Sequence, residues 1–191
     1  MKTLNIDFEV IQEILTNCTN LKELTIGGEI SGQALAYLGN NLPLRIEKFD
    51  LSNNIVNDKF INAIVTKYKN LKALDLSNMA DVTDDHLTAI IEHLKNSLEE
   101  LDLSYTTGGF TLEKLLELKS MPKLKVFQCY HLKEDEIKTL ENDLPNLIKP
   151  IKGLHMGLSL HGNPKDGFWE IQAKQLKIFK QHLSLTEILN R

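Results

Sequence analysis

The chain has 191 residues, of which 42% are hydrophobic and 25% are charged, and its formal net charge at pH 7 is −4. A chain of this length buries about 70% of the surface that its unfolded form exposes, so a stable folded unit is expected. No apolar run approaches the roughly 18 residues that a membrane-spanning helix needs, which argues against a membrane protein.

The charge is unevenly distributed along the chain. Residues 147–191 contain seven basic and three acidic residues, whereas residues 1–146 contain 15 basic and 23 acidic residues. Nucleic-acid binding generally needs a positive face, so the acidic part argues against a nucleic-acid partner. The two cysteines, Cys18 and Cys129, are too few for a disulfide framework and predict a reducing, cytoplasmic environment.

A repeated pattern predicts alternating strands and helices. Segments that start at Leu21, Ile46, Leu71, Leu98 and Leu124 follow the pattern L-x-x-L-x-L, and their starts are 25, 25, 27 and 26 residues apart. Apolar residues two positions apart indicate a short strand with one buried face. The paired apolar residues are Leu24/Ile26, Phe49/Leu51, Leu74/Leu76, Leu101/Leu103 and Phe127/Cys129. A weaker copy at Leu4–Ile6 is expected to supply the first strand.

The second half of each repeat has helical spacing. Between Asp58 and Tyr68 the apolar residues fall on one helix face, and similar stripes cover 87–94 and 112–116. Polar residues that can cap a helix precede the expected helices, namely Ser31, Asn57, Thr83 and Thr111. Because a single strand and helix cannot bury their apolar faces alone, neighbouring repeats are expected to stack.

The pattern fades after residue 146. Leu154–Leu160 alternates as a strand does, and 168–183 has the stripe of an amphipathic terminal helix. Since a repeat array needs a cap at its open end, we predict a repeat array of about five to six repeats over 1–146 and a capping region over 147–191. The lone Trp169 is expected to pack near the last repeat. Docking of the basic terminal helix on a partner or an acidic membrane surface is the alternative.

These repeats resemble the leucine-rich-repeat family over roughly residues 4–146. Cys18, three residues before a repeat start, and the stretch Asp-Val-Thr-Asp at 81–84 are similar to the cysteine-containing subclass, and the repeat length is similar to the ribonuclease-inhibitor-like subclass. Such repeats occur in F-box-type receptors and in bacterial leucine-rich-repeat effectors. The resemblance implies an α/β fold, a leucine-rich-repeat solenoid with a curved parallel sheet on the concave side and helices on the convex side.

In such a solenoid the residues between the buried strand positions face outward. Because adjacent strands lie about 4.8 Å apart, Asp50, Asp75 and Asp102 are expected to form a row of carboxylates that attracts a basic partner. The same aspartates are common in the family consensus, so a role without any ligand stays open. Exposed aromatic residues often dominate binding, which favours Tyr105 and Tyr130. The predicted partner-binding residues are Glu23, Lys48, Asp50, Asp75, Glu100, Asp102, Tyr105, Gln128 and Tyr130.

The sequence contains no catalytic motif. Gly27-Gly28 and Gly108-Gly109 lack the lysine of a phosphate-binding loop, and no G-x-S-x-G motif occurs. His86 and His93 lie seven residues apart without further ligands at metal-binding spacing, so both are expected on a solvated helix face. We therefore expect no enzymatic activity, no cofactor and no metal.

These features favour a non-catalytic protein–protein interaction scaffold that binds a protein partner through its concave face and C-terminal flank. The resemblance implies two alternatives: an adaptor or substrate receptor in ubiquitin ligation that lacks its own F-box, and a bacterial effector delivered into a host cell, where it acts on a host protein. A structural spacer is a third alternative. The identity of the partner and the oligomeric state stay open.

Overall fold

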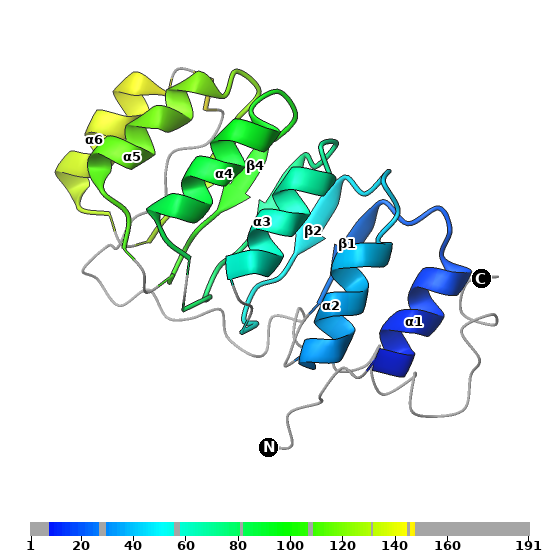
Figure 1. Cartoon of the computed structure of the whole chain (residues 1–191). Helices are drawn as coiled ribbons and strands as arrows, with labels where there is room; N and C mark the ends of the chain where they lie inside the picture. The colour runs from blue at the N-terminus through cyan, green and yellow to red at the C-terminus, as the bar shows by residue number, and fades with distance from the viewer. Residues whose placement is uncertain are drawn as a thin grey trace, which may run out of the picture.

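The computed structural model describes residues 8–147, except 27–29, 56–57, 81, 107–108, 131 and 145. Helices and strands alternate along this part of the chain (Figure 1) in the order α1 (Phe8–Asn17), β1 (Glu23–Thr25), α2 (Gly32–Asn41), β2 (Lys48–Asp50), α3 (Asp58–Lys67), β3 (Ala73–Asp75), α4 (Asp84–Leu94), β4 (Glu100–Asp102), α5 (Leu112–Leu116), the 3-10 helix η1 (Glu117–Ser120), β5 (Val126–Gln128) and α6 (Glu134–Asp143). The expected strand at Leu4–Ile6 and the expected capping elements, including Trp169, lie outside the described residues.

The five strands form one parallel sheet in which each strand pairs with the next one along the chain. The register is regular, because Phe49 pairs with Leu74 and Leu74 with Leu101. Equivalent positions of successive repeats therefore lie side by side. The expected α/β class and the parallel sheet are confirmed.

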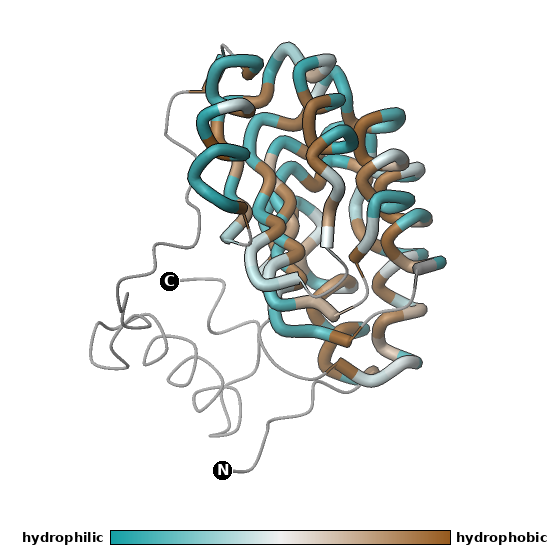
Figure 2. The backbone as a smooth tube through the Cα atoms, turned by 90° about the vertical axis from the view of Figure 1, so that its left-hand side faces the viewer, coloured by the Kyte–Doolittle hydropathy of each residue, from teal (hydrophilic) through white to brown (hydrophobic). Residues whose placement is uncertain are grey.

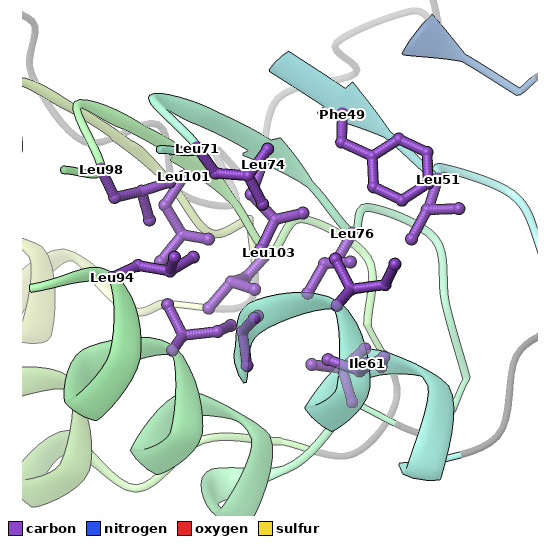
Figure 3. Packing of buried hydrophobic residues seen from close by; sticks show 14 of the residues in the cluster. Phe49, Leu51, Ile61, Leu71, Leu74, Leu76, Leu94, Leu98, Leu101 and Leu103 are labelled. Carbon is purple, nitrogen blue, oxygen red and sulfur yellow. The ribbon is translucent and has the colours of Figure 1, made fainter. Parts of the chain in front are cut away.

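The helices cover one face of the sheet (Figure 1), and the hydrophobic core lies between the two layers. Figure 3 shows Leu74 and Leu103 from the sheet layer together with Leu94 of α4 in this core. The apolar positions of all five strand segments are buried, except that Leu24 is half-buried. Along the helices in Figure 2, hydrophobic residues alternate with hydrophilic ones, which fits helices with one buried side. No helix in the described part of the chain is long and apolar enough to cross a membrane.

Capping residues set the starts of several helices. Ser31 Oγ accepts a hydrogen bond from the backbone N of Ala34 at 3.2 Å, and Thr111 Oγ1 accepts one from the backbone N of Lys114 at 3.3 Å. At the start of α4, His86 Nδ1 accepts from the backbone N of Thr83 at 3.1 Å. Asn57, the remaining expected cap, lies outside the described residues.

The structure corrects the expectation that His86 lies on a solvated helix face. His86 is 2% exposed, whereas His93 is half-buried. The reason is its place in the first turn of α4, where the ring turns back to cap the backbone of Thr83. The spacing of the two histidines carries no information about this capping contact.

Asn54 joins two neighbouring repeats inside the core. Its side chain is buried, and Nδ2 donates to the carbonyl oxygens of Ile26 at 2.8 Å and Leu51 at 3.0 Å. Because replacement by alanine leaves buried carbonyl groups without this donor, we expect Asn54→Ala to lower the free energy of unfolding by about 2 kcal/mol. Urea unfolding checks this value, with Asn40→Ala as the control, since Asn40 is exposed. Equal losses in the two variants would contradict the prediction.

Candidate functional site

The outward side chains of the five strands form two rows on the sheet face away from the helices. One row contains Glu23, Lys48, Ala73, Glu100 and Val126, and the other contains Thr25, Asp50, Asp75, Asp102 and Gln128. Together these ten residues line a shallow hollow of about 200 Å³. We call this surface the sheet hollow. The expected alignment of the three aspartates is confirmed, because Asp75 pairs in register with Asp50 on one side and Asp102 on the other.

The three aspartates also have a task in the fold. In each case Oδ1 accepts a hydrogen bond from the backbone N two residues further on: Ser52 at 2.9 Å, Ser77 at 2.8 Å and Ser104 at 2.8 Å. This bond stabilises the turn at the end of the strand. An asparagine would supply the same acceptor without the charge, so the turn accounts for an oxygen at this position but not for a carboxylate. The spacing of aspartate and serine in the sequence was the signal for this turn.

Asp75 lies at the centre of the aspartate row, and this position makes the ionisation of its carboxyl group less favourable. Burial is the largest cause that raises the pKa of its carboxyl group, the hydrogen bonds from Ser77 lower it, and the neighbouring Asp102 and Asp50 raise it, so that the pKa is about 6. A cation placed over the row would favour the ionised form of Asp75. The centre of the sheet hollow is thus a place where a positive group from outside relieves an unfavourable charge.

The rest of the sheet hollow is mainly acidic. Lys48 Nζ lies 3.3 Å from Glu23 Oε1, and both side chains are more than half exposed. Glu100 is exposed, and Gln128 is half-buried next to Asp102. Five acidic residues and one lysine line the hollow, so its formal charge is −4 with all of them ionised. The acidic surface that the sequence predicted is therefore present, while its role in binding stays a prediction.

Tyr105 and Tyr130 form a stacked pair beyond the ends of β4 and β5. Their ring centroids are 4.9 Å apart, with an angle of 8° between the ring planes, and Tyr105 is 51% exposed. The backbone φ of Tyr105 is positive, at 58°. The φ angles of Asn53 and Asn78, at the equivalent positions of the two preceding repeats, are positive as well. Sequence reasoning selected both tyrosines but missed their stacking. The asparagines at the equivalent positions indicate the backbone conformation of this turn, since asparagine tolerates a positive φ better than an aromatic residue does, but they give no signal for the stacking.

A second polar cluster, which sequence reasoning did not select, lies just before the strands. Glu47 contacts Lys22 at 3.2 Å and Lys72 at 2.6 Å, and these two lysines lower the pKa of its carboxyl group. Lys125 contacts Glu99 at 2.6 Å. Exposed ion pairs of this kind contribute little to the stability of a fold. This cluster mixes both signs of charge, with three lysines and two glutamates, whereas the sheet hollow is mainly acidic.

Metal-binding and disulfide chemistry find no support in the described residues. Within these residues, no three His, Cys, Asp or Glu side chains come together in a group that could hold a metal ion. Cys18 is half-buried, Cys129 is buried, and both are free thiols. The expectations about enzymatic activity, cofactors and location remain predictions.

Comparison with known proteins shows a likeness in fold alone. No family model matches the chain, and no curated protein matches it. The structure titled leiomodin-1 actin-binding site 2 is similar with a TM-score of 0.57 and 17% identity over 91% of this chain and 95% of that chain. The C-terminal domain of tropomodulin from Caenorhabditis elegans is similar with a TM-score of 0.56 and 13% identity over 87% of this chain and 96% of that chain.

These findings correct the expected resemblance to ribonuclease-inhibitor-like and cysteine-containing repeats of F-box-type receptors and bacterial effectors. That assignment is wrong, since the similar structures are leiomodin and tropomodulin domains and no family model matches. The L-x-x-L-x-L pattern follows from the stacking of short parallel strands under helices. It therefore indicates this packing arrangement and does not identify a particular group of proteins. Of the residues that such repeats keep as asparagine or cysteine, only Asn54 is present, while Met79, Thr106 and Leu132 fill the equivalent positions.

Proposed function

We propose that this chain is a non-catalytic protein-binding module that holds its partner in the sheet hollow. The observation that carries the proposal is the hollow itself, which residues from all five strands line with one dominant sign of charge. In this proposal the repeats continue as a solenoid, with the sheet on the concave side and the helices on the convex side. A rigid, acidic wall raises the local concentration of a basic surface and orients its approach.

The fold-level likeness supplies a defined protein for the first binding test. The leiomodin-1 structure is titled as an actin-binding site, which is a statement about leiomodin. Actin is our candidate partner because a protein of the same fold binds it. The proposal that the sheet hollow is the binding surface does not depend on actin.

We expect the variant Asp50→Asn/Asp75→Asn/Asp102→Asn to bind the partner at least about tenfold more weakly than the wild type, because the change removes three charges from the hollow and keeps the turn acceptors. Titration of labelled actin with each protein measures this change. The control Glu9→Gln/Glu13→Gln/Asp143→Asn removes three exposed charges from α1 and α6 and is expected to bind as the wild type does.

The outcomes separate the surface from the partner. Equal binding of actin by the wild type and the aspartate variant contradicts the sheet hollow as the site. Absence of actin binding by the wild type removes actin as the candidate. In that case the hollow is tested with a partner captured from cell lysate and identified, using the same two variants.

A further inference from the structure

We propose that the occupant of the sheet hollow is an extended basic segment of the partner protein, one of whose arginine side chains lies flat against the stacked pair Tyr105–Tyr130. This inference rests on the proposed function and names the chemistry of the partner at that site. Three features of the described residues carry it: the charge of the hollow, the place of the tyrosine pair beyond the ends of β4 and β5, and the exposure of Tyr105.

Charge complementarity selects a basic occupant. The hollow is lined by five acidic residues, and the single lysine among them, Lys48, already contacts Glu23. A partner segment with lysine or arginine side chains therefore meets carboxylates along the row Asp50, Asp75 and Asp102. An acidic segment would add like charge to this row and is disfavoured.

The shape of the hollow selects an extended segment. The three middle strands place Asp50, Asp75 and Asp102 in register, so carboxylates recur from β2 to β4 at intervals of about 4.8 Å. An extended chain that runs across the strands presents side chains to the hollow at alternate residues, roughly 7 Å apart. Such a segment can place several cations along the row without folding into a domain of its own.

The tyrosine pair selects arginine over lysine at the border of the hollow. The rings stack in nearly parallel planes at a centroid distance of 4.9 Å, and Tyr105 is 51% exposed. Tyr130 follows Gln128 by two residues and Tyr105 follows Asp102 by three, so the tyrosine pair lies beyond the ends of β4 and β5, next to this end of the aspartate row. A planar guanidinium group stacks on an aromatic face and binds a carboxylate at the same time, which an ammonium group does less well.

The repeat itself supplies a variant that removes the rings and keeps the fold. Asn78 and Asn53 occupy the position equivalent to Tyr105, and Ser104 and Ser77 occupy the position equivalent to Tyr130. Asn53 and Asn78 adopt the same positive φ as Tyr105, so Tyr105→Asn suits the backbone there. The double variant Tyr105→Asn/Tyr130→Ser therefore restores residues that the neighbouring repeats already use. The aromatic control is Tyr37→Leu, which changes the ring pair of Phe8 and Tyr37 on α1 and α2.

The test titrates the full chain with three fluorescent twelve-residue peptides that alternate glycine with arginine, lysine or glutamate. We expect the wild type to bind the arginine peptide about three- to fivefold more tightly than the lysine peptide and not to bind the glutamate peptide. For the variant Tyr105→Asn/Tyr130→Ser, the affinity for the arginine peptide is expected to fall to the affinity for the lysine peptide. The Tyr37→Leu control is expected to keep its preference for the arginine peptide. Asp102→Asn is expected to weaken both basic peptides.

Three results would overturn the inference: no measurable binding of the arginine peptide, equal binding of the arginine and lysine peptides by the wild type, or an arginine preference that survives in the folded tyrosine variant. Circular dichroism and thermal unfolding verify that each variant is folded. Failure here is distinguishable from failure of the proposed function. Partner binding that depends on the three aspartates but not on the tyrosines leaves the sheet hollow as the site and removes only its arginine specificity.

Discussion

Leu76→Ala is expected to lower the free energy of unfolding by about 3–4 kcal/mol. Leu76 is fully buried at the middle strand of the sheet, where it packs between the strand layer and the helix layer (Figure 3). Truncation removes buried methyl and methylene groups and leaves a cavity that the stacked repeats on both sides cannot easily fill. Because total stability of a domain is on the order of 5–15 kcal/mol, this loss is a large fraction of it.

Leu44→Ala is the matched control for Leu76→Ala. The chemical change is the same, but Leu44 is 64% exposed in the turn before β2, so its truncation is expected to change the free energy of unfolding by less than about 0.5 kcal/mol. Urea unfolding of the three proteins gives the two differences directly. Similar losses in both variants would show that Leu76 does not lie in the core that the structure describes.

Asp75→Asn is expected to stabilise the protein at pH 7 by roughly 2–3 kcal/mol, with the gain disappearing as the pH falls towards 4. The pKa of Asp75 is raised from 3.8 to about 6 in the folded chain, chiefly by burial. Between these two values the folded state holds more protons than the unfolded state, so the free energy of unfolding falls as the pH rises through this window. One pKa unit corresponds to about 1.4 kcal/mol, which sets the size of the effect.

Unfolding of the wild type and Asp75→Asn in urea at several pH values from 4 to 7 tests this prediction. The difference between the two proteins isolates Asp75, since the other titrating groups contribute alike to both. Asparagine keeps an oxygen that accepts from the backbone N of Ser77, so the turn is retained. Asp143→Asn, an exposed change in the last turn of α6, is the control for the removal of one carboxylate. A difference that does not vary with pH would contradict the raised pKa.

The stabilising effect of Asp75→Asn also bears on the proposed function. An ionised Asp75 is expected to destabilise the fold at neutral pH, while its charge contributes to the acidic surface of the sheet hollow. The turn bond alone does not require the charge, because asparagine would make it as well. We therefore expect Asp75→Asn to increase the free energy of unfolding and to weaken the binding of a basic partner. A gain in stability together with a loss of affinity would support a role of this charge in binding.

Much of the local architecture was predictable from the spacing of residues in the chain. Apolar residues two apart predicted the strand segments, the helical stripe within Asp58–Tyr68 predicted α3, and Ser31 and Thr111 were correctly recognised as caps. These features are local, because the side-chain periods of a strand and of a helix and the capping bond involve residues close in the chain. The stacking of Asp50, Asp75 and Asp102 was also predictable, since a constant repeat length places equivalent residues in register.

The roles of individual polar groups follow instead from how the repeats pack together. The tertiary structure showed that burial between neighbouring carboxylates raises the pKa of Asp75, that Tyr105 stacks on Tyr130, and that His86 turns into a cap. The fold is also similar to proteins outside the subclasses that the repeat pattern suggested. The physical reason is the same in each case: periodicity fixes which face of an element a residue occupies, whereas burial, charge and ring contacts depend on residues of other repeats that packing brings within a few ångströms.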